Sequence, residues 1–490
     1  MRRATALLAL ALVSACEVGP DYERPPAPVP AAYKGAQGWK PATPQDEIPR
    51  GSWWAIYQDP VLDGLEKEID ISNQTLKAAE AAYRQARAVV AEARAGYFPT
   101  LTGTGSGTRS GTGSNAGRSS SASASGGFGG GGSRSFSTID LTADASWTAD
   151  LWGRIRRTVE SNVASAQASA ADLANARLSA QGQLATLYFE LRAADEQARL
   201  LNASVDAFTQ SLNITRNQYA AGVAAQTDVV TAETQVEQTR SQAIAVGVQR
   251  AQFQDAIAVL IGKPASDFSV APAPLTTTVP VAPAGLPSEL LERRPDIAAE
   301  ERLVAAANAQ IGVATAAFYP NVTLSASYGF TSTGFANLIR AQNALWSVGG
   351  QAVQTIFDGG LLTAQLEAAK ASYDETVANY RGTVLTGFQQ VEDELAALSI
   401  LEQQSVVETK TVALARQAER LTLNQYQAGT QPYTAVITAQ TTRLNNEITA
   451  LGILQSRLVA SVALVQALGG SWQASDLPDR DKVEGDWKPY

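Results

Sequence analysis

The spacing of hydrophobic residues along the chain switches between a period of two and a period of three to four. Apolar and polar residues alternate over 138–148 and over 322–330, which predicts strands with one apolar and one polar face. Over 154–219 and 361–426 apolar residues recur every three to four positions without any Pro, which predicts two very long helices. At 1.5 Å of rise per residue each would approach roughly 100 Å, a length typical of coiled coils. Their many Ala residues permit close packing of helices in the wall of a cylinder.

Weaker patterns predict the remaining elements. A helix is expected from Asp59-Pro60 to about Tyr97, where Pro99 follows. The segment 100–109 alternates weakly, and 346–357 is expected to be the partner strand of the second hairpin, broken at its Gly-Gly pair. The Gly/Ser tract 111–133 is interpreted as an exposed mobile loop, because the flanking strand and helix of a phosphate-binding loop are missing.

The two strand-and-helix patterns are copies of one unit, and such repeats define an architecture. The segment NQYAAGVAAQTDVVTAETQVEQTR at 217–240 is echoed by NQYQAGTQPYTAVITAQTTRLNNE at 424–447. The aromatic-Pro landmark ending at Pro99 recurs at Pro320, and Gly153 recurs as Gly360. Each copy therefore runs helix, aromatic-Pro, strands, Gly, very long helix, turn and returning helix.

Both copies turn at a Tyr-x-Ala-Gly sequence. Gly222 and Gly429 supply the positive φ that commonly ends a helix. Thr227-Asp228 offers N-cap oxygens for the next helix, and Pro432 is tolerated only before a helix or in its first turn. Alone, each turn would be an ordinary helical hairpin; their repetition in matching context makes them notable.

Composition excludes several classes of function. The formal net charge is −9, which argues against a nucleic-acid partner, since phosphate binding needs clustered cations. His is absent, Met occurs only at position 1, and Cys16 is the single cysteine. Histidine-based catalysis, zinc fingers and intrachain disulfides are therefore excluded, and no enzymatic activity or metal site is expected.

The N-terminus explains the lone cysteine. Arg2-Arg3 precedes an apolar stretch, 6–13, that is too short to span a bilayer, which takes roughly 20 residues. Small residues then lead to Cys16, a pattern that resembles a bacterial lipoprotein signal; the alternative is a plain secretory signal with an incidental Cys. A covalent lipid on Cys16 would anchor the chain to membrane lipid, and Glu17, rather than Asp, points to the outer membrane.

Strand arithmetic predicts an oligomer. Strands of about ten residues with apolar outer faces fit a transmembrane barrel, although a soluble sandwich would show the same alternation. Two hairpins supply four strands, whereas the smallest membrane barrels need about eight. Strand edges cannot stay unpaired in lipid, so the barrel must close between subunits.

Several motifs resemble the TolC-like outer membrane factors, specifically the lipoprotein branch of RND-type efflux channels (OprM/NodT-like). They are CEVGPDY at 16–22, DLWGR at 150–154, LPSELLERRPDI at 286–297 and the two turns, and the likeness extends to about Trp472. The resemblance implies an α+β membrane protein: a homotrimer whose protomers each give four strands to a 12-stranded barrel continued by a periplasmic helical barrel. It further implies a periplasmic adaptor protein and an inner-membrane RND-type transporter as partners.

The resemblance also places a gate at the periplasmic tip. The tip residues it indicates are Tyr219, Gly222, Asp228, Tyr426, Gly429 and Gln431. Asp228 and Tyr426 match residues of the family's resting tip network. This chain departs from the pattern at Gln431, where the family has a basic residue, and at Ala435 and Thr438, where it has acidic ones. Asp228 therefore has two open roles, gating or capping its helix, and the Arg-Arg-Pro at 293–295 is interpreted as a structural helix start.

The predicted function is a passive exit duct of a tripartite efflux pump, gated at the tip; protein (type I) secretion is the alternative, and a trimeric adhesin is disfavoured by the duplicated unit. The predicted organisation begins with a signal peptide (1–15) and a lipidated extended tether (16–52), for which Trp53, Trp54 and Tyr57 are expected to be packing anchors. A first repeat (53–285) has a strand hairpin at about 99–150 and a helical hairpin at 153–263, and a second repeat (286–472) has a strand hairpin at about 320–357 and a helical hairpin at 360–470. A tail (473–490) of unassigned role follows.

Overall fold

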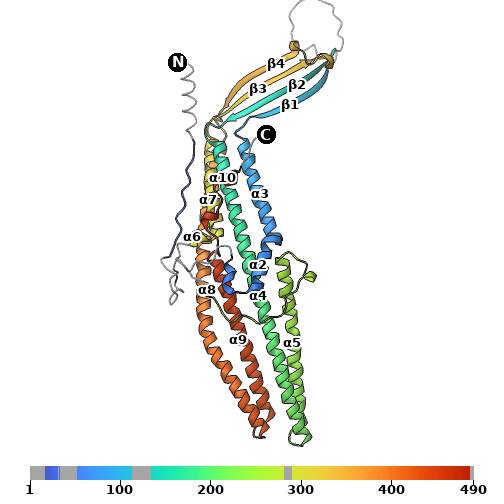
Figure 1. The fold of residues 1–490 in the computed structure, drawn as a ribbon. Helices are drawn as coiled ribbons and strands as arrows, with labels where there is room; N and C mark the ends of the chain where they lie inside the picture. Colours follow the sequence, from blue (N-terminus) through green and yellow to red (C-terminus); the bar gives the residue numbers. More distant parts are fainter. Residues whose placement is uncertain (1–16, 31–32, 34–51, 113–133, 281–289, 486–490) are drawn as a thin grey trace, which may run out of the picture.

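The protein is elongated, with a sheet at one end and two helical hairpins reaching the other (Figure 1). The computed structural model describes residues 17–30, 33, 52–112, 134–280 and 290–485. The main elements are η1 (Trp53–Tyr57), α2 (Pro60–Ser72), α3 (Gln74–Ala95), β1 (Thr100–Thr112), β2 (Arg134–Ala149), α4 (Arg154–Ala220), α5 (Gln226–Leu260), α6 (Leu290–Arg293), α7 (Pro295–Ala316), β3 (Asn321–Ser332), β4 (Ala344–Val353), α8 (Leu361–Gln427), α9 (Tyr433–Ala467) and α10 (Arg480–Glu484).

The four strands form one antiparallel sheet in the order β1-β2-β3-β4, so the two hairpins pair through β2 and β3. The predicted alternation is confirmed by the register. One face carries apolar residues such as Leu141, Leu324 and Trp346, and the other carries hydroxyl residues with Asp140 and Asp144.

The expected break in the last strand is wrong. Gly349 and Gly350 pair in register with Ser325 and Leu324, so β4 continues through them. A Cβ on Gly350 would lie 3.1 Å from the Leu324 side chain. The glycine therefore leaves room for Leu324 and does not interrupt the strand.

The two long helices are confirmed: α4 and α8 have 67 residues each. Each follows a glycine with positive φ, Gly153 at 79° and Gly360 at 95°. A carboxylate upstream satisfies free amides of the first turn: Asp150 accepts from the amides of Ile155 and Arg156 at 3.0 Å each.

The single helix expected over 59–97 is two helices, α2 and α3, because Asn73 interrupts it. Its backbone is extended (ψ 123°), its Oδ1 accepts from the Leu76 amide at 3.0 Å, and its Nδ2 donates to the Leu260 carbonyl at 2.7 Å. An Asn that caps a new helix favours this non-helical conformation.

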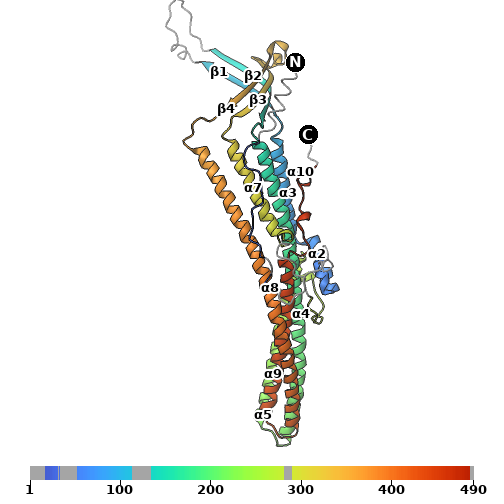
Figure 2. The same ribbon diagram turned by 90° about the vertical axis from the view of Figure 1, so that its left-hand side faces the viewer.

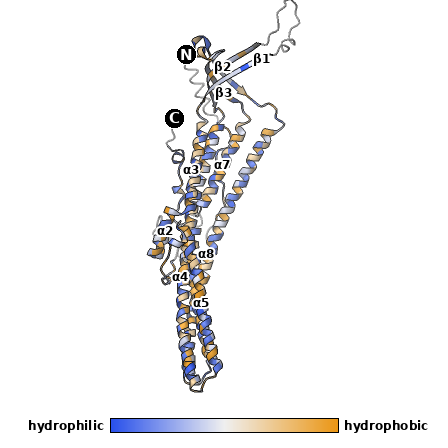
Figure 3. Cartoon of the chain, turned by 90° about the vertical axis from the view of Figure 1, so that its right-hand side faces the viewer, coloured by the Kyte–Doolittle hydropathy of each residue, from blue (hydrophilic) through white to orange (hydrophobic). Residues whose placement is uncertain are grey.

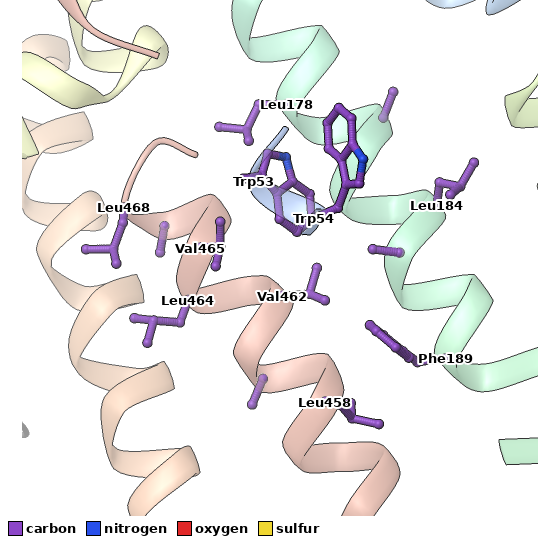
Figure 4. Close-up of a cluster of buried hydrophobic side chains, with 14 of the residues drawn as sticks. Trp53, Trp54, Leu178, Leu184, Phe189, Leu458, Val462, Leu464, Val465 and Leu468 are labelled. Atoms are coloured by element: carbon purple, nitrogen blue, oxygen red, sulfur yellow. The ribbon is translucent and has the colours of Figure 1, made fainter. Parts of the chain in front are cut away.

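An apolar core midway along the helices joins the N-terminal elements to α4 and α9 (Figure 4). Trp53, Trp54 and Tyr57 are buried, as expected of packing anchors. Their polar atoms are satisfied: Trp54 Nε1 donates to Asp63 at 2.8 Å, and the hydroxyls of Tyr57 and Ser461 lie 2.6 Å apart.

The C-terminal tail, for which the sequence suggested no role, folds back onto α3 and α4. Val483 of α10 is 1% exposed and packs with Val90, Val159 and Val163. Glu484 forms an ion pair with Arg94 at 3.1 Å. The tail therefore clips α3 against α4.

In the described part of the chain, one helix, α9, is long and apolar enough to cross a membrane by length and composition. Its buried residues, Leu458, Val462 and Val465 among them, belong to the mid-helix core, so α9 is a core helix of the bundle. The signal peptide, Cys16 and the Gly/Ser tract beyond Thr112 lie outside the described residues.

Candidate functional site

The two Tyr-x-Ala-Gly turns lie at the same end of the molecule, farthest from the sheet (Figures 1 and 2). Their backbones match. Gly222 has φ 75° and Gly429 has φ 73°. Val223 donates to the Gln218 carbonyl and Thr430 to the Gln425 carbonyl, each at 2.9 Å. In both turns, these bonds close the end of a 67-residue helix.

The second turn is tied to the first copy by Tyr426. This side chain is 5% exposed, and its hydroxyl lies 2.9 Å from the hydroxyl of Thr215 on α4. Gln218 of α4 donates to the Tyr426 carbonyl at 3.5 Å. The end of α8 is therefore held to the end of α4 by both its side chain and its backbone.

Tyr433, at the start of α9, completes a buried cluster with Tyr426. Their ring centroids are 5.5 Å apart with the planes tilted by 55°, and Tyr433 is 2% exposed. Burial, Tyr426 and the charge of Asp228 raise the pKa of Tyr433 to about 12, and burial raises the pKa of Tyr426 as well. Phe208, Leu212, Ala232, Val236, Val436 and Leu444 surround the pair.

The equivalent tyrosine of the first turn behaves differently. Tyr219 is 47% exposed, although its backbone matches that of Tyr426. The position equivalent to Tyr433 is Gln226, which is also exposed. Within one chain, the first turn therefore presents its aromatic side chain outward while the second turn buries its own.

The sequence suggested Asp228 as an N-cap of α5, but the structure places it inside the helix. Ala225 is the N-cap, and Asp228 is three residues further on, where its Oδ2 accepts from the Ala225 amide at 3.3 Å. A carboxylate in the first turn still stabilises the helix start, because it lies near the positive end of the helix dipole. Gln431 is exposed in the loop before Pro432.

Sequence reasoning missed Thr215, Gln218 and Tyr433, which make the main contacts to Tyr426. It also missed Gln440, whose Nε2 donates to Ser211 at 2.9 Å between α9 and α4. Thr215 and Gln218 lie within one helical turn of Tyr219 on α4, so the repeat alignment marked their neighbourhood without showing that they contact the second copy.

The site offers hydrogen bonds and packing. Within the described residues, no group of three or more Cys, His, Asp or Glu side chains is arranged to hold a metal ion. The hydrogen bond between the hydroxyls of Tyr426 and Thr215 joins the α8–α9 hairpin to α4 without a covalent link.

Comparison with known proteins places this architecture. The sequence profile of the outer membrane efflux protein family matches residues 66–263 and 286–470. The chain belongs to the outer membrane efflux protein family. Two relatives match over nearly their full lengths. The pyoverdine export outer membrane protein OpmQ of Pseudomonas aeruginosa is 31% identical over 480 residues, or 95% of this chain and 97% of the relative. The probable efflux pump outer membrane protein TtgC of Pseudomonas putida is 30% identical over 94% of each chain.

Solved structures agree with this assignment. The outer-membrane channel OprN superposes with a TM-score of 0.83 at 29% identity, covering 94% of this chain and 100% of that one. The MtrE channel of Neisseria gonorrhoeae in its open state gives 0.80 at 26% identity, covering 94% and 99%. This outer membrane efflux protein is therefore a non-enzymatic channel of the bacterial outer membrane that extends into the periplasm as a component of a tripartite efflux pump.

Proposed function

We propose that three copies of this outer membrane efflux protein close into one duct that is gated at the two turns. Each copy would give its four strands to a 12-stranded barrel. A lipid on Cys16, a periplasmic adaptor and an inner-membrane RND-type transporter complete the proposal. The chain would divide into the lipidated tether, two repeats and tail expected from the sequence.

The main support for a barrel that closes between copies is that the sheet has two unpaired edges. In the order β1-β2-β3-β4, the outer edges of β1 and β4 pair with no described strand of the same chain. Unpaired backbone amides and carbonyls are costly in lipid, and four strands are too few for a barrel. Pairing of β1 with β4 of a second copy removes both edges at once.

Exposed apolar stripes on the helices support the same closure. On α8, Ile400, Val407, Leu414 and Leu421 recur every seven residues, and each is more than half exposed. On α5, Val230, Ile244 and Val248 are likewise exposed, and hydrophobic colour on α5 is visible in Figure 3. Heptad spacing of apolar residues is the pattern by which helices pack on other helices. We infer that α8 of one copy packs against α5 of the next.

Tyr426 is the proposed latch of the gate. Separation of the α8–α9 hairpin from α4 would break its hydrogen bond to Thr215 and disturb its packing on Tyr433. A hydroxyl hydrogen bond contributes about 1 kcal/mol. If three latches open together, they favour the closed state by about 3 kcal/mol, or about 100-fold. Asp228 would act through the start of α5, while exposed Tyr219 and Gln431 would face a neighbouring copy or the adaptor.

The transported solutes are proposed to be small molecules, since the named relatives serve pyoverdine export and efflux pumps. The duct itself supplies a path, and the transporter supplies the energy. Protein secretion remains the alternative function, and among the features described above none favours it.

Single-channel conductance in planar bilayers tests the gate. Tyr426→Phe removes one hydroxyl and keeps the ring, so the open probability of the purified protein should rise by up to about 100-fold. Tyr219→Phe is the matched control, because this side chain is exposed in the equivalent turn, and it should leave the open probability unchanged.

Equal effects of the two substitutions, or no effect of Tyr426→Phe, would mean that Tyr426 is no latch. Folded protein that never conducts, in any variant, would contradict the duct itself. Cross-linking of the purified protein in mild detergent would separately test for three copies.

A further inference from the structure

The segment that follows Cys16, Glu17–Tyr22, belongs to a motif that the function described above leaves without a role. We call it the hook. It has no helix or strand, yet each of its six residues touches the body of the protein at α4, α7 or the turn before α4. A free lipid tether would need none of these contacts.

Arg157 of α4 lies at the centre of the surface that receives the hook. Its side chain is only 4% exposed. It pairs with Glu17 at 3.2 Å and with Asp21 at 2.9 Å, and it donates to the carbonyls of Val18 and Gly19 at 3.4 Å each. Glu160 of α4 also pairs with it at 2.8 Å. Four of its five partners are supplied by the hook, so departure of the hook would remove most of the acceptors of this guanidinium.

Close backbone contact fixes the hook along α7. Gly19 has φ 101°, and a Cβ added to it would lie 2.5 Å from the Cα of Gly312. Only two residues without side chains allow this approach. One turn earlier on α7, Asn308 Nδ2 donates to the Pro20 carbonyl at 3.0 Å.

The two ends of the hook are held by different partners. Tyr22 donates its hydroxyl to Glu301, and the guanidinium of Arg302 lies 5.6 Å from the centre of its ring. At the other end, the Val18 amide donates to the Trp152 carbonyl at 3.3 Å, in the turn between β2 and α4. Glu17 is therefore fixed where the sheet meets the helices.

We propose that Arg157, Gly312 and Asn308 form a seat that binds the hook and fixes the point from which the N-terminal anchor leaves the body. Arg157 is its central positioning residue. Cys16 is covalently next to Glu17, and neighbouring Cα atoms are about 3.8 Å apart. The seat thus sets the height of the anchor relative to the sheet, at the base of the strands, instead of leaving it on a long free tether. This inference rests on the proposed lipidation of Cys16 for its use, but not for the binding of the hook.

Digestion of the full-length purified protein with a glutamyl endopeptidase tests the seat. Cleavage after Glu17 or Asp21, within the hook, requires the hook to leave the seat, so the rate of cleavage at these two sites reports the local opening equilibrium. Arg157→Met keeps the aliphatic stem and removes every donor, so the hook loses two ion pairs and two carbonyl hydrogen bonds at once. Because hydrogen bonds to a charged group each contribute about tenfold or more to an equilibrium constant, release of the N-terminal fragment should become at least about tenfold faster. Arg154→Met, on the exposed side of the same helix, is the matched control and should not change it.

A second pair of variants keeps the test valid if Arg157→Met disturbs folding. Gly19→Ala changes only the hook and should release the fragment at least about tenfold faster because of its positive φ and its contact with Gly312. Gly64→Ala, where an added Cβ would meet nothing within 4 Å, should not.

The same digest separates this inference from the lipid proposal. A smaller change in both Arg157→Met and Gly19→Ala would overturn the seat. The mass of the released fragment shows independently whether Cys16 carries lipid. Protection that persists in a Cys16→Ser variant would confirm that the seat binds the hook without the lipid, and loss of protection there would overturn the seat as a self-sufficient site.

Discussion

The two helical turns at the tip have the same backbone and opposite side-chain environments. Both end a 67-residue helix with a glycine of positive φ, and both are followed by a helix of 35 residues. Tyr426 is 5% exposed and Tyr219 is 47% exposed. Duplication of the unit therefore preserved the geometry of the turn, while the residues around it determine which copy makes contacts inside the chain.

The difference originates in partners from both copies. Tyr426 contacts Thr215 and Gln218 of the first copy and Tyr433 of its own, whereas Gln226 occupies the place of Tyr433 in the first copy. The second turn is thus fixed within the chain, and the first turn leaves its aromatic ring exposed. Substitutions at matched positions in the two copies can test how much this difference contributes to the stability of each turn.

The largest difference is expected at Tyr433 and Gln226. Tyr433→Ala removes a fully buried ring from the tip cluster and should cost about 3–5 kcal/mol of local stability. Gln226→Ala changes an exposed residue and should stay within about 0.5 kcal/mol. Hydrogen exchange of the tip peptides, read by mass spectrometry, gives both values. Similar losses in the two variants would show that the turns are equally packed and would remove the basis of the comparison.

An intermediate effect is expected in α2, a helix of 13 residues in the first copy. Within the described residues of the second copy, the corresponding helix is α6, which has four residues. Glu66 is 0% exposed, and neither of its carboxylate oxygens has a hydrogen-bond partner in the described structure. Burial first, then the neighbouring charges of Asp70 and Asp63, raise its pKa to about 9.

The pKa of Glu66 is higher in the folded protein than in the unfolded one, so protonation of Glu66 favours folding. This contribution to stability is fully present below the unfolded pKa of about 4.5 and is lost as the pH rises toward about 9. Glu66→Gln should therefore stabilise the protein at pH 7 by up to about 3 kcal/mol and have little effect near pH 4. Thermal unfolding of both proteins at the two pH values measures this. A stability gain that is equal at both values would show that Glu66 does not titrate in this range.

The smallest effects should be equal in the two turns. Gly222→Ala and Gly429→Ala each place a Cβ on a residue with φ near 75°, at a cost of about 1–2 kcal/mol. Neither Cβ would meet another atom within 4 Å, so the cost is backbone strain alone. Hydrogen exchange at each turn should show the same loss. Unequal losses would mean that the backbones of the turns differ in solution.

Most of the architecture was predictable because its signals are local. The period-two and period-3.6 patterns defined β2, β3, α4 and α8, and glycine-ended turns placed the tips to within a residue or two. The errors arose where one side chain changes the local preference. Asn73 divides the first helix by capping its second half, and Gly349-Gly350 sits in a continuous strand because Leu324 needs the space.

Much of the site was not predictable, because its contacts join residues distant in sequence. The hydroxyls of Tyr426 and Thr215 meet across 211 positions, and a single sequence carries no signal for such a pair. The repeat alignment marked the correct turns and the correct tyrosines, but it implied that Tyr219 and Tyr426 are equivalent. For the same reason, the sequence predicts only a tether where the structure has the hook, because the hook accepts hydrogen bonds from Arg157, which is more than 130 positions away.

The equal lengths of the paired helices limit how the duct can change its length. Removing one residue from α4 alone would shorten that helix by about 1.5 Å and rotate everything beyond the deletion by about 100°. The first tip would then lie out of level with the second and turn its apolar side away from α9. A longer or shorter duct is therefore reached through matched insertions or deletions of about seven residues, two turns, in all four long helices at once. The reach of the protein across the periplasm is a quantity set jointly by both halves of the gene, and neither half can adjust it alone.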